Sequence, residues 1–120
     1  QLMIDIEETI QMMFVGFIDD FSALHLMLLY YLNNPERWFS DRAIKNPNTM
    51  GGISSALEIA IPEFKEEKDL IVPLATDLYN KGLINTEGRM FNSMMSKSGM
   101  MAKRTTNLGE RFIQYISSDK

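Results

Sequence analysis

The chain contains no cysteine among its 120 residues. This excludes a disulfide framework and any zinc site built on thiolates. A single histidine, His25, is present, so a metal site made of several histidines is impossible, and we expect no histidine-based catalytic triad. We interpret His25 as a structural or surface residue. The lack of cysteine suits a reducing compartment, and we expect a cytoplasmic protein.

Long apolar runs and N-terminal basic residues are also lacking. The longest apolar runs, such as residues 26–32, are far shorter than the roughly 20 residues that a transmembrane helix needs. Residues 1–18 carry acidic residues but no lysine or arginine, which does not fit a secretory signal peptide. The chain begins at Gln1, and we interpret it as a piece excised from a longer protein, forming one domain over residues 1–120.

The formal net charge of −4 is unevenly distributed along the chain. Residues 1–88 contain 14 acidic and 6 basic residues, whereas residues 89–120 contain 2 acidic and 6 basic residues. An anion-binding surface is therefore expected mainly in the last quarter of the chain. The basic residues predicted to contact nucleic acid there are Arg89, Lys97, Lys103, Arg104 and Arg111.

Neighbouring acidic pairs occur at three places in the chain, and they could in principle bind a cation. Adjacent residues on a helix point in different directions, and no pair shows the spacing and glycine of a calcium-binding loop. We therefore expect no metal and no cofactor. The pairs are Glu7-Glu8, Asp19-Asp20 and Glu66-Glu67.

The first 18 residues predict an amphipathic helix from Leu2 to Ile18, because apolar residues recur at helical spacing. Its apolar stripe needs a cover, and a second copy of the chain could provide one. We therefore predict a self-association surface formed by Ile6, Ile10, Met13 and Phe17.

Capping signals predict the next helices. Ser22 can cap a helix over residues 23–32 that is apolar on most sides and should form the centre of the core. Asn34 followed by Pro35 predicts a short third helix, and residues 41–52 predict a loop. A fourth helix is predicted to start at Ser54 or Ser55 and to end near Pro62.

A helix from Glu66 to Lys81 is predicted next. Pro73 lies inside it, which predicts a kink or a delayed start. Gly82 is expected to end this helix in the left-handed conformation, with Leu83 folding back onto Leu78.

The remaining residues predict two short strands, a wing and a final helix. Residues 83–85 and 100–105 fit strands, while residues 86–99 fit either a strand or a helical turn. Thr106 or Asn107 is expected to cap the last helix. One buried cluster is predicted to contain Leu28, Leu78, Ile84, Phe112 and Ile116.

Ten methionines are present, and four of them lie close together around residues 96–99. Methionine fills irregular cores, and it is also common on adaptable binding surfaces. The sequence leaves both interpretations open for Met94, Met95, Met100 and Met101.

This order of elements resembles a winged helix, and two segments carry the resemblance. Residues 77–84 read DLYNKGLI, and residues 104–112 read RTTNLGERF. They are similar to winged-helix families related to the multiple-antibiotic-resistance and phenolic-acid regulators. Residues 24–39 also resemble the pattern LHLxLLxxLxxPxxWF of bacterial winged-helix proteins of uncharacterised function.

The resemblance covers roughly residues 20–117 and leaves residues 1–18 as an additional helix. It implies a mainly α fold with a small β-hairpin wing, that is, a winged helix-turn-helix with an additional N-terminal helix. In such a fold the helix over residues 66–81 would enter the major groove with its N-terminal part. That part reads EEKD and the helix has no arginine, which opposes contact with phosphates.

We therefore predict a non-catalytic interaction or dimerisation module of a bacterial protein rather than an enzyme. A protein partner or a homodimer is the expected partner. The alternative is a DNA-binding transcriptional regulator that contacts DNA mainly through its basic wing.

Overall fold

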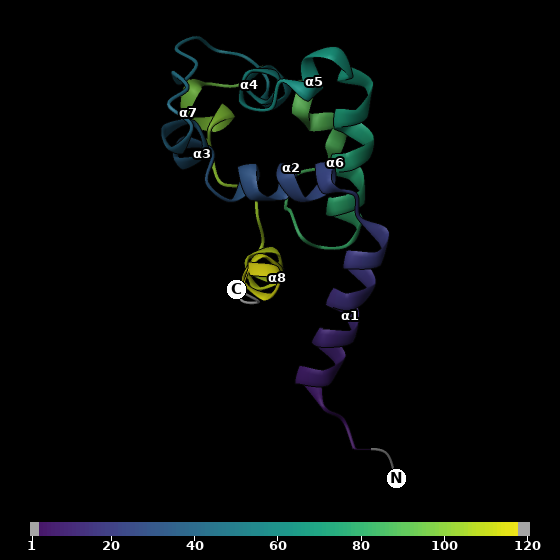
Figure 1. Cartoon of the computed structure of the whole chain (residues 1–120). Coiled ribbons are helices and arrows are strands. Elements are labelled where there is room, and N and C mark those ends of the chain that lie inside the picture. The colour runs from purple at the N-terminus through teal and green to yellow at the C-terminus, as the bar shows by residue number, and fades with distance from the viewer. Residues whose placement is uncertain (1–2, 118–120) are drawn as a thin grey trace.

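The computed structural model describes residues 3–117 and is mainly helical (Figure 1). Eight α-helices and two short 3-10 helices lie within this range, which confirms the predicted mainly α class. In chain order the elements are α1 (Ile6–Asp20), α2 (Ala23–Asn33), α3 (Pro35–Asp41), α4 (Ile53–Ala60), α5 (Glu63–Glu66), η1 (Lys68–Leu70), α6 (Ile71–Asn80), η2 (Gly88–Asn92), α7 (Lys97–Met100) and α8 (Asn107–Ser117).

Helix α2 lies at the centre of the fold (Figure 1). Its apolar residues Leu28, Leu29 and Leu32 are completely buried, and it contacts α3, α6 and α8. Ser22 caps the helix, since its side chain accepts a hydrogen bond from the His25 amide. The predicted cap and the predicted central position of this helix are both confirmed.

The buried tyrosine of α2, Tyr31, lies among the rings of Trp38 and Phe39, with ring centroids about 6 Å apart. Among the residues that the structure describes, its hydroxyl has no hydrogen-bond partner. Because the ionised phenolate would lose its hydration in this environment, burial raises the pKa of Tyr31.

Helix α1 leaves the body of the molecule at its C-terminal end and extends away from it (Figure 1). Asp5 caps its first turn by accepting a hydrogen bond from the Glu8 amide at 3.1 Å. The rings of Phe14 and Phe17 lie 5.1 and 5.5 Å from that of Phe112 in α8. The predicted amphipathic helix is confirmed, although it starts at Ile6; Leu2 lies outside the described residues.

Helix α6 begins at Ile71 rather than at Glu66, so the delayed start predicted from Pro73 is confirmed. Proline lacks an N–H group, and its ring clashes with the carbonyl four residues before it. A continuous α-helix from Glu66 is therefore disfavoured. Instead, α5 ends at Glu66, and residues 68–70 form the 3-10 helix η1. Pro73 lies in the first turn of α6, where its missing donor is not needed.

The C-terminal end of α6 has the predicted glycine cap. Gly82 has a φ of 79°. The Leu83 amide donates to the Leu78 carbonyl at 3.0 Å, and the Gly82 amide donates to the Tyr79 carbonyl at 2.9 Å. These two bonds define a Schellman motif. Leu78 and Leu83 are both completely buried.

The predicted β-hairpin wing is absent from the described residues. Residues 3–117 contain two isolated antiparallel bridges, Gly51 with Met95 and Ile84 with Thr105. The strand predicted over residues 100–105 is wrong except at Thr105, since Met100 ends α7. The ambiguous segment 86–99 instead contains η2 and most of α7.

Hydrogen bonds made by side chains between residues 86 and 104 favour a helical loop over a hairpin. Ser96 caps α7 by accepting from the Gly99 amide at 3.2 Å. The Arg104 guanidinium donates to the Gly99 carbonyl at 2.6 Å and to the Thr86 hydroxyl at 3.3 Å. These contacts are made by side chains rather than by a ladder between two strands, and they favour a compact helical loop.

Most of the predicted core is confirmed. Leu28, Leu78, Ile84 and Phe112 are buried in one cluster, while Ile116 is only partly buried against it.

The predicted start of the fourth helix is wrong, because α4 begins at Ile53 with Gly52 at the N-cap position.

The start of α8 lies very close to the end of α6. The Thr106 hydroxyl accepts from the Gly109 amide at 3.0 Å and donates to the Gly82 carbonyl at 2.6 Å. The Thr106 amide donates to the Leu83 carbonyl at 3.0 Å. A Cβ atom on Gly109 would overlap the Leu83 carbonyl oxygen. Glycine is therefore required at position 109 by this close approach.

We predict opposite effects for alanine at two helical glycines. Gly109→Ala should lower the free energy of unfolding by about 1–3 kcal/mol, because the added methyl group forces α8 away from Leu83. Gly16→Ala is the matched control, since a Cβ there meets no atom within 4 Å, and it should raise stability by about 0.5–1 kcal/mol. Urea unfolding measures the free energy of unfolding of both variants. Equal changes in the two variants would contradict the close approach of Gly109 to the Leu83 carbonyl.

Candidate functional site

The basic residues predicted to contact nucleic acid lie on several different elements. Lys103 pairs with Glu110, and Arg89 on η2 pairs with Glu87 at 3.3 Å. Lys97 is exposed on α7. The other two residues of the set, Arg104 and Arg111, lie in different surroundings.

Arg104 is part of the internal structure. Its guanidinium donates to Gly99 and Thr86, and its Nε atom is buried. Arg111 is exposed on α8 and lines a hollow of about 340 Å³ between α1 and α8, together with Glu7. Arg104 is therefore bonded within the chain, while Arg111 is exposed on a different helix from Lys97.

We predict that Arg104 contributes to stability, in contrast to the exposed arginine Arg89. Arg104→Met should lower the free energy of unfolding by about 1–3 kcal/mol, because charged hydrogen bonds to buried partners are lost. Arg89→Met removes a surface ion pair and should change stability by less than about 0.5 kcal/mol. Denaturant titration measures both changes. A loss at Arg104 no larger than the loss at Arg89 would show that the guanidinium has no structural role.

The predicted self-association stripe on α1 is only partly exposed. Ile6 is 64% exposed and Met13 is 41% exposed. Ile10 is partly buried, and Phe17 is 6% exposed because it packs against α8. Phe17 is therefore covered by its own chain, while Ile6 and Met13 remain available to a partner.

The four clustered methionines divide between the two interpretations. Met100 and Met101 are buried in the core, and Met95 packs against it. Met94 is 70% exposed. Packing explains three of the four, and one remains on the surface.

Ser22, His25 and Asp77 form a row of hydrogen bonds that the sequence analysis did not predict. The Ser22 hydroxyl lies 2.8 Å from His25 Nδ1, and His25 Nε2 lies 2.8 Å from Asp77 Oδ2. His25 is buried and stacks on the ring of Phe21, with centroids 5.0 Å apart. These are the residue types of a catalytic triad.

The geometry of this row is that of a helix cap rather than of an activated nucleophile. His25 Nδ1 also accepts the Ser22 backbone N–H at 3.0 Å, so this N–H shares the one lone pair of Nδ1 with the hydroxyl 2.8 Å away. The Ser22 hydroxyl accepts the His25 amide at 3.3 Å, which completes a capping box. Nε2 then carries the proton that is donated to Asp77, whose side chain is 56% exposed. In a triad the orienting carboxylate is instead buried.

The row connects the α1–α2 junction to α6. A second contact acts at the same place, because Lys81 Nζ lies 3.8 Å from Asp20 Oδ2 and 6.0 Å from the centre of the Phe17 ring. The His25–Asp77 contact joins residues 52 positions apart. Sequence reasoning missed it because no local spacing signals such a pair.

We predict that His25 and Asp77 are energetically coupled. In a double-mutant cycle with His25→Phe and Asp77→Ala, which each remove one partner of the hydrogen bond, the coupling free energy should be about 0.5–1.5 kcal/mol, the usual range for a single hydrogen bond. Thermal or urea unfolding of the four proteins measures it. Losses that simply add would mean that the two side chains do not interact in solution.

A hollow of about 560 Å³ lies between α2, α3 and α8. The Arg42 guanidinium lies 3.3 Å above the centre of the Trp38 ring, and the Trp38 indole donates to the Ala60 carbonyl at 3.0 Å. Arg37 pairs with Asp41 at 3.4 Å. The charged groups around this hollow are thus already engaged with neighbours on α3.

Within residues 3–117, no group of three or more His, Cys, Asp or Glu side chains is placed to hold a metal ion. None of the helices in that range combines the length and the apolar character needed to cross a membrane.

Comparison with protein families, with curated proteins and with solved structures finds no match for this chain.

Proposed function

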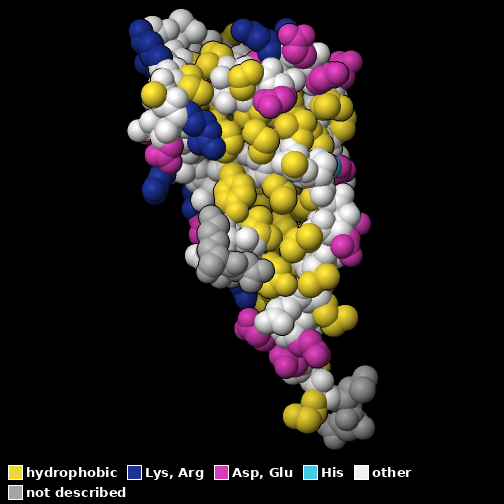
Figure 2. Space-filling model, viewed as in Figure 1, with side chains coloured by type: hydrophobic (Ala, Val, Ile, Leu, Met, Phe, Trp, Pro, Cys, Tyr) yellow, Lys and Arg dark blue, Asp and Glu magenta, His cyan; other side chains and the backbone are white. Residues whose placement is uncertain are grey.

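We propose that this chain is a non-catalytic interaction module that forms a homodimer through α1. The observation that carries the proposal is the uncovered apolar surface of that helix. Helix α8 covers α1 at Phe14 and Phe17. The N-terminal half of α1 extends beyond α8 (Figure 1). Figure 2 shows hydrophobic side chains continuing along the visible face into α1. The exposed apolar residues of α1 are Ile6, Met12, Met13, Val15 and Ile18.

Charge supports a second copy as the partner, and it also restricts how the two copies pack. Helix α1 carries acidic residues and no lysine or arginine. Two α1 helices side by side would therefore repel each other. Arg111 is exposed on the neighbouring α8, so α1 of one copy fits better against α8 of the other. Each copy would then contribute the same surface, formed by α1 and α8, as a two-fold interface requires.

The proposal includes a winged-helix plan for residues 20–117. Helices α2, α4 and α6, followed by the antiparallel contact of Ile84 with Thr105 and then by α8, support this plan. The segment that would be the wing is helical. Helix α6 has no lysine or arginine, so DNA recognition by this helix is less well supported than dimerisation.

We predict that polar substitutions on α1 separate the dimer. Ile6→Ser combined with Met13→Ser should give a monomer of 13.8 kDa, while the unmodified chain should have about twice that mass. Both residues are exposed, so the monomer should keep its helix content. Sedimentation or light scattering over a range of concentrations measures the mass, and circular dichroism measures the helix content.

The matched control combines Met50→Ser with Met94→Ser. These methionines are 64% and 70% exposed but lie outside α1, so this variant should remain dimeric. A mass of 13.8 kDa for the unmodified chain at every concentration would refute the proposal. Dissociation of the control to the same extent would also refute it, because the contact would then not be specific to α1.

A further inference from the structure

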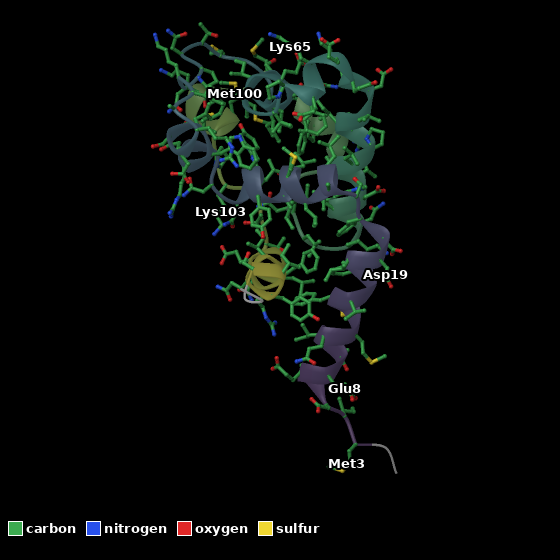
Figure 3. All side chains as sticks on the ribbon, in the orientation of Figure 1. Met3, Glu8, Asp19, Lys65, Met100 and Lys103 are labelled. Atoms are coloured by element: carbon green, nitrogen blue, oxygen red, sulfur yellow. The ribbon has the colours of Figure 1, made fainter. Side chains whose placement is uncertain are left out.

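Basic and acidic side chains are separated on the surface. In Figure 2 most Lys and Arg side chains gather on one side of the visible face, while most Asp and Glu side chains lie on the other side and toward α1. Figure 3 places Lys103 on the basic side, opposite the end of α1 that carries Asp19. Basic residues from α3, α7, the loop between α3 and α4 and the turn before α8 are Arg37, Arg42, Lys45, Lys97 and Lys103.

Two adjoining hollows lie along these elements. One, of about 310 Å³, is lined by residues that include Lys45 and Lys97. The other, of about 500 Å³, is lined by residues that include Lys103. Glu36, Ser98 and Met101 line both hollows, so the two adjoin. We call the pair of hollows the α3–α7 groove.

The side chains of this groove match the chemistry of a phosphate backbone. Lys45 and Lys97 are exposed, and neither forms an ion pair within residues 3–117. Lysine supplies the positive charge that neutralises phosphates. Neutral donors such as asparagine and serine add hydrogen bonds to phosphate oxygens. The neutral polar residues that line the groove are Asn33, Asn34, Asn46, Asn48 and Ser98.

We propose that the α3–α7 groove binds the phosphodiester backbone of a nucleic acid without reading its bases. Base recognition needs arginine or amide side chains presented on a helix or strand inside a groove of the duplex. The groove offers lysines on loops and short helices instead. This site differs from the predicted basic wing, because Lys45 joins it while Arg89, Arg104 and Arg111 do not. It does not depend on dimerisation, although a dimer would carry two such grooves.

Titration of a labelled DNA duplex of mixed sequence at several salt concentrations tests the proposal. Each phosphate contact contributes about 0.9 to the slope of log affinity against log salt. Lys45→Gln combined with Lys97→Gln should therefore lower that slope by about two units. Both side chains are on the surface, so the melting temperature should stay close to that of the unmodified chain.

The matched control is Lys65→Gln combined with Lys68→Gln, which removes the same charge from α5 and η1. Neither Lys65 nor Lys68 lines the α3–α7 groove, and Figure 3 shows Lys65 at the top of the body, above Lys103, so this variant should keep the original slope. Glu36→Gln removes the acidic side chain that lines both hollows and should tighten binding. The proposal is overturned if both lysine pairs lower the slope equally, if Glu36→Gln weakens binding, or if the unmodified chain does not bind duplex at low salt.

Discussion

The arrangement of the chain depends on the close approach of α8 to the end of α6. The left-handed Gly82 turns the chain so that the Leu83 carbonyl can accept the Thr106 amide. Gly109 has no side chain, which lets the first turn of α8 lie directly against that carbonyl. The position of α8 in turn places Phe112, the ring against which α1 packs. One backbone contact therefore determines where three helices lie.

Local signals in the sequence were sufficient for much of this fold. Ser22, Asn34 and Thr106 cap helices where their side chains can reach a free amide two or three residues ahead. Gly82 ends α6 as its sequence context indicates. The prediction of a β-hairpin wing was wrong, because the pairing of strands depends on residues that are distant in the sequence. Arg104 and Ser96 satisfy backbone groups in that segment instead, and neither contact leaves a periodic signal.

The candidate surfaces were less predictable than the fold, for a related reason. Charge counting finds basic residues but cannot tell an exposed lysine from an arginine bonded inside the chain, as Lys97 and Arg104 illustrate. Lys45, which lines a hollow together with Lys97, was not among the predicted residues because it lies in the acidic part of the sequence. An amphipathic stripe likewise identifies α1 as a packing helix, but it does not show that α8 already covers Phe17. These distinctions depend on contacts between residues far apart in the chain.

The molecule is about twice as long as it is wide, because α1 extends away from its body (Figure 1). The principal extents are 58 × 30 × 25 Å, and α1 has 15 residues, a length of about 22 Å. The stacked rings of Phe21 and His25 lie at the α1–α2 junction. For a helix of this length, a change of about 10° in its direction corresponds to a shift of about 4 Å at its far end. The position of the N-terminal tip of α1 therefore depends on how closely Phe14 and Phe17 pack against Phe112.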